Sequence, residues 1–330
     1  MAPAVPEIQR VAAEMVSLSG SLANKRGVAL ITVLLITALV SMMVVSMVSS
    51  QQIDIRRNGN IVDGDQCLVL AEGVVDWAVQ VLIRDKKNGG NDSLGEEWAI
   101  GLIPTEVEGG AVSGFLEDMH GRFNLNNLVS TKPDLQGQSR KQFERMLDMC
   151  GLDTNLLNAL IDWLDADSDL TSGGGAEDET YAWLETPYRT ANSIMTSPSE
   201  LQLVAGFDYK AYNCLAPHIT TLPLFPTEPL VNVNTASAFV LAALSADFSL
   251  NEAKNFVEER PAGGYASVND FLQDQNLAGS GIAGTFLTVS SDYFLANAKA
   301  EVGNGRVSMY SLLYRQGNKV DKINKSIGAY

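Results

Sequence analysis

The chain has 330 residues, enough for a sizeable core and for more than one domain. It carries 23 basic and 39 acidic residues, a formal net charge of -16, which argues against nucleic acid or anionic lipid as the main partner and favours divalent cations. Only two histidines, His120 and His218, are present, so a histidine-rich zinc site or a Ser-His-Asp hydrolase has little to be built from.

An uncharged, largely apolar run follows the basic pair Lys25-Arg26 and Gly27. From Val28 to about Val48 it is long enough to cross a membrane as a helix, which takes roughly 20 residues. It exceeds the apolar region of a secretory signal peptide, about 7 to 15 residues, and no Ala-x-Ala cleavage site follows it. The sequence therefore predicts one membrane-spanning helix, and the basic pair leans towards a cytoplasmic amino end. A plain signal anchor is one interpretation of this run.

The helix is predicted to continue beyond the membrane. After a polar patch, apolar residues return at steps of three and four and mark one face of a helix that runs to Lys87 and stops at Asn88-Gly89-Gly90. About 60 residues at helical rise span roughly 90 Å, so the second half must pack one face on a globular head. Residues 1–27 lack this periodicity and are interpreted as a leader outside the fold.

Strands, then helices, then strands again are predicted beyond the helix. The expected fold class is α+β: a long amino-terminal helix, residues 28–88, packed on an antiparallel sheet, with a large all-helical domain inserted between strands. The head is assigned to 89–130 and 285–330 and the insertion to 131–284. We expect strands near 98–100, 111–118, 121–128, 286–290, 293–301 and 306–316, the last two joined by a hairpin at Gly303-Asn304-Gly305.

The segment Asp162–Glu179 is the strongest candidate for chemistry. Alternate aspartates leave a helix end and enter a glycine-rich loop that returns with more acids, and hard oxygen ligands on such a loop suit Ca²⁺. The spacing is not that of an EF-hand, because Leu170 occupies the sixth place, where glycine is required. A solvated acidic loop is the alternative, but a cation is the simpler account of so many neighbouring acids. We expect ligands from the set Asp165, Asp167, Asp169, Glu177 and Asp178.

The segment Val231–Leu272 resembles a helix-hairpin-helix module, a fold often used on DNA. Its hairpin, Ser245–Leu250, has no glycine and carries Asp247 where a phosphate would lie, so DNA binding is disfavoured. We therefore interpret it as a packing or partner-docking unit. A helix is expected to open near Val231, with Asn234 or Thr235 as its N-cap.

Three cysteines leave two interpretations open. Cys67 lies in the long helix, whereas Cys150 and Cys214 lie in the soluble part, within the predicted insertion, and could pair in an oxidising compartment. Three free buried thiols is the alternative.

The junction between Lys25 and Val28 resembles the class III signal of type IV prepilins and pseudopilins. That resemblance implies a cut between Gly27 and Val28 by a prepilin peptidase, which leaves the helix on the mature, methylated protein. The fifth mature residue in that family is normally glutamate, which pairs with the amino terminus of a neighbour; here it is Thr32. A carboxylate in hydrocarbon needs a partner, so Thr32 indicates a subunit with none ahead of it.

A subunit of this kind resembles the minor pseudopilin K family of type II secretion systems, which the block Gly121–Asn126 and the acidic loop also match. The resemblance implies a non-enzymatic subunit at the tip of the pseudopilus that initiates or caps assembly for protein export across the outer membrane. It implies calcium, an inner-membrane anchor with a periplasmic head, and as partners the other minor pseudopilins, the prepilin peptidase and the inner-membrane secretion platform. A membrane-anchored metal-dependent hydrolase and a DNA-uptake component remain as alternatives.

Overall fold

The computed structural model describes residues 7–226 and 228–328, with side chains described from Gly27 onward except at position 88. It divides into two compact units, Met1–Val62 and Asp63–Tyr330, which are described separately. Helix α1 spans Glu7–Asn88. The prediction that regular structure begins at Val28 is wrong, because the helix starts directly after Pro6 and residues 7–26 contain no proline to interrupt it. Residues 1–6 of the expected leader lie outside the described residues.

The first unit contains the apolar part of α1. All side chains from Val28 to Val48 are exposed. The hydroxyls of Thr32 and Thr37 donate to carbonyls three residues earlier in the helix, at 2.8 and 2.9 Å, so they are satisfied without water. Among the described residues one helix, Gly27–Lys87, is long and apolar enough to cross a membrane by length and composition.

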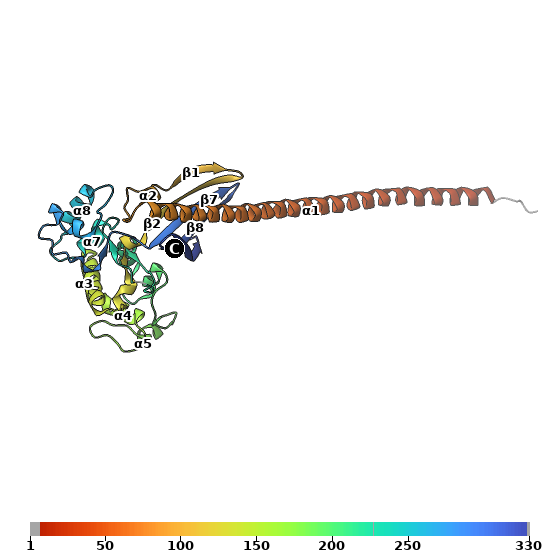
Figure 1. The fold of residues 1–330 in the computed structure, drawn as a ribbon. Helices are drawn as coiled ribbons and strands as arrows, with labels where there is room; N and C mark the ends of the chain where they lie inside the picture. The colour runs from red at the N-terminus through yellow and green to blue at the C-terminus, as the bar shows by residue number, and fades with distance from the viewer. Residues whose placement is uncertain (1–6, 227, 329–330) are drawn as a thin grey trace, which may run out of the picture. The chain divides into compact units, whose positions relative to one another are not determined.

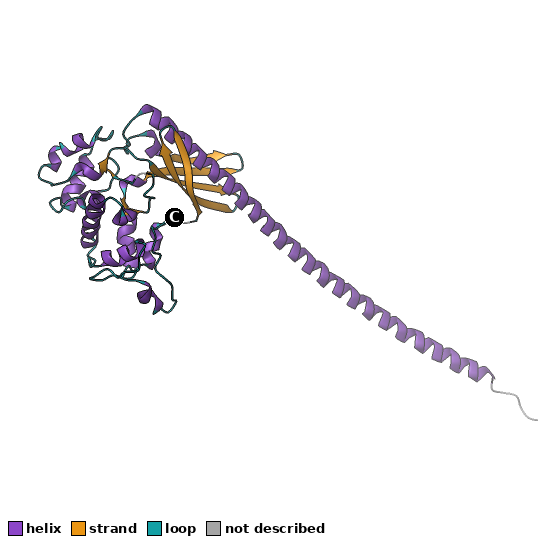
Figure 2. Cartoon of the chain, turned by 60° about the horizontal axis from the view of Figure 1, so that its bottom comes forward, coloured by secondary structure: helices purple, strands orange, loops and turns teal. Residues whose placement is uncertain are grey.

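In the second unit, the last part of α1 packs on one face of a five-stranded antiparallel sheet (Figures 1 and 2). Apolar residues of α1 such as Val75 and Leu82 are fully buried there, and a side chain at Gly114 would collide with Val74. The predicted helix-on-sheet arrangement and the hairpin between Val302 and Gly305 are confirmed. The sheet order is β1-β2-β7-β8-β9, with β1 Leu102–Val107, β2 Gly110–Asp118, β7 Tyr293–Val302, β8 Gly305–Gln316 and β9 Lys319–Ile327.

Two predicted strands are wrong. Residues 98–100 belong to a short helix, α2 (Glu97–Ile100), whose buried Trp98 donates its indole N–H to Glu96. The strand expected at 121–128 shrinks to β3 (Phe123–Asn124), because the Asn124 side chain accepts from the backbone two residues on and turns the chain into the 3-10 helix η2 (Leu125–Val129). Strand β3 pairs in parallel with β4 (Ile219–Thr220), outside the main sheet.

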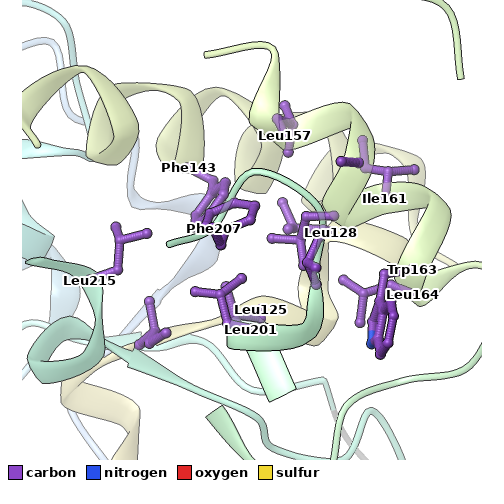
Figure 3. Packing of buried hydrophobic residues seen from close by; sticks show 14 of the residues in the cluster. Leu125, Leu128, Phe143, Leu157, Ile161, Trp163, Leu164, Leu201, Phe207 and Leu215 are labelled. Carbon is purple, nitrogen blue, oxygen red and sulfur yellow. The ribbon is translucent and has the colours of Figure 1, made fainter. Parts of the chain in front are cut away.

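The predicted helical insertion lies between β2 and β7 and forms two units. The first helical unit, residues 121–224, surrounds a core in which Phe143 of α3 and Phe207 lie near Leu125 and Leu128 (Figure 3). The elements between β2 and β5 are η1 Met119–Gly121, α3 Pro133–Met149, α4 Leu156–Leu164, α5 Asp178–Ala182, η3 Pro198–Leu203, α6 Tyr209–Leu215 and η4 Ala216–His218, together with β3, η2 and β4.

The second helical unit, residues 231–290, has its own apolar core. The helix expected in this segment forms as α7 (Ala238–Ala242), but it starts later than predicted: its N-cap is Ser237 instead of Asn234 or Thr235, and the chain before it forms β5 (Val231–Asn232). Strand β5 pairs in parallel with β6 (Leu287–Thr288), which is all that forms of the strand expected at 286–290. Its helices are α7 Ala238–Ala242, α8 Leu250–Glu259, α9 Val268–Leu272, η5 Gln275–Leu277 and η6 Gly284–Phe286.

Buried polar contacts join the sheet to α1 and to the second helical unit. Arg315 of β8 is 1% exposed and contacts Asp85 of α1 and Asp92. At the end of β2, Asp118 accepts hydrogen bonds from Asn232 and from the Ser291 hydroxyl, at 2.9 and 2.6 Å. A buried carboxylate is costly unless it is hydrogen-bonded, so these contacts specify how the helical part joins the head.

The cysteines follow the pairing interpretation. Cys150 and Cys214 form a disulfide with Cα atoms 6.1 Å apart, and it links the end of α3 to α6 within the first helical unit. Cys67 is free and buried between α1 and the sheet.

Candidate metal site

The predicted acidic loop begins where α4 ends. Asp162, in the last turn of α4, is fully buried and accepts backbone N–H bonds from Thr171 and Ala176, so it closes the loop on itself. A side chain at Gly175 would lie 2.3 Å from the Asp162 carboxylate and 2.5 Å from the Thr171 carbonyl. Glycine is therefore required there, and the glycine-rich stretch closes the loop tightly.

The closed loop gathers three of the five predicted ligands. One carboxylate oxygen from each of Asp165, Asp167 and Glu177 lies within 4.8 Å of the others. Asp165 Oδ1 and Glu177 Oε1 are buried and have no hydrogen-bond partner, and Glu177 as a whole is 7% exposed. Buried polar atoms are normally paired, so these two oxygens indicate a missing positive partner.

A fourth oxygen was not predicted as a ligand. The side-chain amide of Asn192 donates to the Asp167 carbonyl at 2.7 Å, while its Oδ1 is buried without a partner. Among the described residues Asn192 is the one non-glycine with a positive φ, 42°. A residue held in that sparsely populated region marks a constrained site. Sequence spacing could not find it, because Asn192 follows Asp167 by 25 residues.

Asp169 and Asp178 lie outside this group. The Asp169 backbone N–H donates to Asp167 Oδ1, and its own side chain is exposed. Asp178 accepts from the backbone and hydroxyl of Thr190, at 2.9 and 3.0 Å, and lies 3.9 Å from Arg189. The Asp178 carboxylate therefore helps to hold the loop, whereas Asp169 contributes its backbone N–H, and the part of both acids as direct ligands stays a prediction.

The group is electrostatically strained. Burial, and then the neighbouring carboxylates of Asp167, Asp162 and Glu177, raise the pKa of Asp165 to about 6, while Arg140 acts in the opposite direction. Burial is also the main cause that raises the pKa of Glu177. A bound cation would relieve this repulsion, because it favours the charged form of each carboxylate.

The donor set fits calcium. Hard oxygen donors on a loop are what Ca²⁺ takes, whereas the soft sulfur and imidazole ligands preferred by zinc are absent from the group. Asp165, Asp167 and Glu177 would hold the ion, with Asn192 Oδ1 adding a neutral oxygen and backbone carbonyls completing the shell.

The helix-hairpin-helix segment offers an acidic hairpin. Between α7 and α8, Phe248 is 4% exposed and anchors the turn in the core, whereas Asp247 is exposed. An exposed acid at this position repels phosphate. The geometry agrees with a packing unit.

Both helical units match models of one family. Residues 121–224 and residues 231–290 match two models described as type II secretion system protein K. Protein K of Pseudomonas aeruginosa is 36% identical over 321 residues, with 92% of this chain and 93% of the relative covered. The chain therefore belongs to the type II secretion system protein K family. Relatives from Aeromonas hydrophila and Pectobacterium carotovorum are 33% and 32% identical, and this chain covers 97% and 98% of them.

The fold is shared with a solved structure. A chain of the GspK-GspI-GspJ complex of enterotoxigenic Escherichia coli matches with a TM-score of 0.74 over 83% of this chain, at 24% identity. Membership of the family makes this protein a minor pseudopilin of the type II secretion system, a structural component of protein transport. These relatives support neither the hydrolase nor the DNA-uptake alternative.

Proposed function

We propose that this minor pseudopilin occupies the tip of the pseudopilus, where it initiates or caps fibre assembly for export across the outer membrane. Cleavage between Gly27 and Val28 by a prepilin peptidase leaves α1 as a single-pass inner-membrane anchor with its head in the periplasm. The mature amino terminus is methylated. Its partners are the other minor pseudopilins and the inner-membrane secretion platform.

The observation that carries the tip position is Thr32. The Thr32 hydroxyl satisfies itself by donating to Ala29 O at 2.8 Å, so it offers no charge to the amino terminus of another subunit. A glutamate in hydrocarbon is tolerated only where a partner compensates its charge. With threonine at this position, the chain needs no such partner ahead of it. The large insertion between β2 and β7 supports the same position, because its bulk would prevent a second subunit from stacking above this one.

Partners are proposed from the fold and the family. The solved relative forms a complex with GspI and GspJ, and the disulfide between Cys150 and Cys214 agrees with an oxidising compartment such as the periplasm. Calcium in the acidic loop would stabilise the first helical unit and would take no part in a reaction.

The amino terminus of the mature protein tests the pilin-type processing. Edman or mass-spectrometric sequencing of the chain from membranes is expected to start at Val28, and Gly27→Ile is expected to leave the leader attached. A mature chain that starts elsewhere, or that keeps residues 1–27 in the wild type, contradicts the proposal.

A further inference from the structure

An exposed apolar pair, Trp183 and Leu184, lies beside the acidic loop. Trp183 is 85% exposed and the following Leu184 is 44% exposed, although tryptophan is on average among the more buried residue types. Both residues directly follow α5, and Figure 1 places α5 at the end of the helical part far from β1 and α2. This pair therefore lies away from the sheet edge formed by β1.

The pair sits on a rigid base. Tyr181, two residues before Trp183, is 1% exposed; its ring lies edge-on to Trp163 at 5.5 Å, and its hydroxyl accepts the Ala205 N–H at 3.1 Å. The backbone N–H groups of Trp183 and Leu184 both bond to the Tyr181 carbonyl. An anchor held in place before binding loses little conformational entropy when it docks.

The acidic loop also fixes the start of this segment. Glu177 belongs to the carboxylate group and is the N-cap residue of α5. One residue that would hold calcium is thus six positions before Trp183, and its carbonyl accepts the Thr180 N–H at 2.7 Å in the first turn of α5.

The surroundings of the pair are strongly acidic. Residues 162–189 contain eight acids and one base, Arg189, so even a bound Ca²⁺ leaves this surface negative. Glu179 and Glu185, on either side of the pair in sequence, are exposed. Tryptophan is enriched among residues that dominate binding energy, and complementary charge steers the encounter. The matching surface is an apolar pocket bordered by lysine or arginine.

We propose that Trp183 and Leu184 are a docking anchor for a protein outside the pseudopilin fibre that presents such a pocket. The inference rests on the proposed function, since it requires this chain to occupy the tip, where the first helical unit can meet a protein outside the fibre. The acidic rim sets the charge of the partner, and the metal loop holds the anchor in position.

The test measures export in cells that carry the full chain. Trp183→Ala combined with Leu184→Ser is expected to lower the exported protein in the medium at least about tenfold, as loss of a binding hot spot would. Glu179→Lys with Glu185→Lys is expected to lower it as well. Tyr209→Ala is the matched control, because Tyr209 is an aromatic residue of the first helical unit that is 77% exposed; it should leave export unchanged.

Two further measurements keep the outcome specific. The Trp183/Leu184 variant should keep its calcium-dependent melting temperature and should co-purify with the other minor pseudopilins as the wild type does. Unchanged export overturns the anchor, and so does a loss of export that accompanies lost co-purification or lost stability. A strain that lacks the whole chain distinguishes failure of the proposed function from failure of the anchor. Normal export in that strain contradicts the proposed function, whereas normal export in the Trp183/Leu184 variant alone contradicts only the anchor.

Discussion

The two helical units are built on the same plan and differ in one loop. Asn126 of the first unit accepts the Met195 N–H and donates to the carbonyls of Met195 and Leu222. Asn234 of the second unit makes the same three bonds, to Tyr265 and Val289. Each asparagine follows a two-residue strand, β3 or β5, that pairs in parallel with a distant two-residue strand.

The two helical units differ in the length of the connection between a helix and the residue whose backbone the asparagine binds. In the second unit residues 260–264 connect α8 to Tyr265, five residues, whereas in the first unit residues 165–194 connect α4 to Met195, thirty residues. The longer connection carries the acidic group, Asn192 and the exposed Trp183. One helical unit is thus a plain packing module, and in the other the same frame carries the acidic loop and the proposed docking anchor.

The disulfide gives the largest expected difference between the units. Cys150 and Cys214 close a loop with a sequence separation of 64 residues in the first unit, and the second unit has no cysteine. Replacing both by serine is expected to destabilise the first unit by about 4 kcal/mol in the chain-entropy account. Hydrogen exchange resolved by peptide is the measurement: protection should fall in residues 121–224 and persist in 231–290. Equal loss in both units would contradict their independence.

The paired asparagines test the shared plan. Asn126→Ala leaves the buried N–H and C=O of Met195 without their partner, while the Leu222 carbonyl keeps its bond from Asn124. The expected cost is about 2–4 kcal/mol in the free energy of unfolding. Asn234→Ala should cost a similar amount, because it breaks the equivalent bonds. Asn276→Ala, which removes one exposed bond to Glu259, is the control and should stay within about 0.5 kcal/mol. Urea denaturation measures the free energy of unfolding of each variant. If either buried substitution costs no stability, the two asparagines do not have equivalent roles.

Calcium is expected to stabilise the first helical unit and to leave the stability of the second helical unit unchanged. Calcium at 100 times its dissociation constant is expected to stabilise the fold by about 2.7 kcal/mol. Asp165→Asn with Asp167→Asn should abolish that gain, whereas Asp247→Asn in the second unit should preserve it. Differential scanning calorimetry with calcium or with chelator gives the readout. A melting temperature that changes with neither calcium nor chelator would refute the metal site. If the Asp165/Asp167 variant kept its fold and lost an enzymatic turnover, the metal would instead be catalytic.

The contact between α1 and the sheet provides a smaller effect outside both helical units. Burial, and then the carboxylates of Glu96 and Asp92, raise the pKa of Asp85 to about 6 despite Arg315. The folded pKa lies above the unfolded value, so this group favours folding at low pH and its contribution is lost as pH rises through 6. Asp85→Asn should therefore flatten the rise in melting temperature between pH 7.5 and 5.5, a change of a few °C, roughly. An unchanged pH profile would contradict the shift.

Hydrophobic periodicity predicted the elements that bury one face. The stripe from Leu68 to Leu82 gave the packed end of α1, and the glycine turn gave the hairpin between β7 and β8. Strand β9 was missed because most of its residues are polar and it has little apolar alternation. Lys322 of this strand pairs with Glu72 of α1, so an ion pair stands where the sequence pattern would need an apolar residue.

Side-chain hydrogen bonds set the limit of that prediction. Alternation at Phe123 and Leu125 favoured a strand, but Asn124 and Asn126 bind backbone groups far away in sequence and turn the chain. The acids of the metal loop were visible as a cluster, whereas Asn192 was not, since its place depends on a fold that brings residue 192 back to Asp167.

The most direct test of the account counts this chain in isolated pseudopili of different lengths. If the helix with Thr32 can take only the first position, each fibre holds a fixed number of copies, and the ratio to the main fibre subunit falls as the fibre lengthens. Quantitative mass spectrometry of length-fractionated fibres measures that ratio. A ratio that stays constant with length would place the chain along the fibre and contradict the tip position.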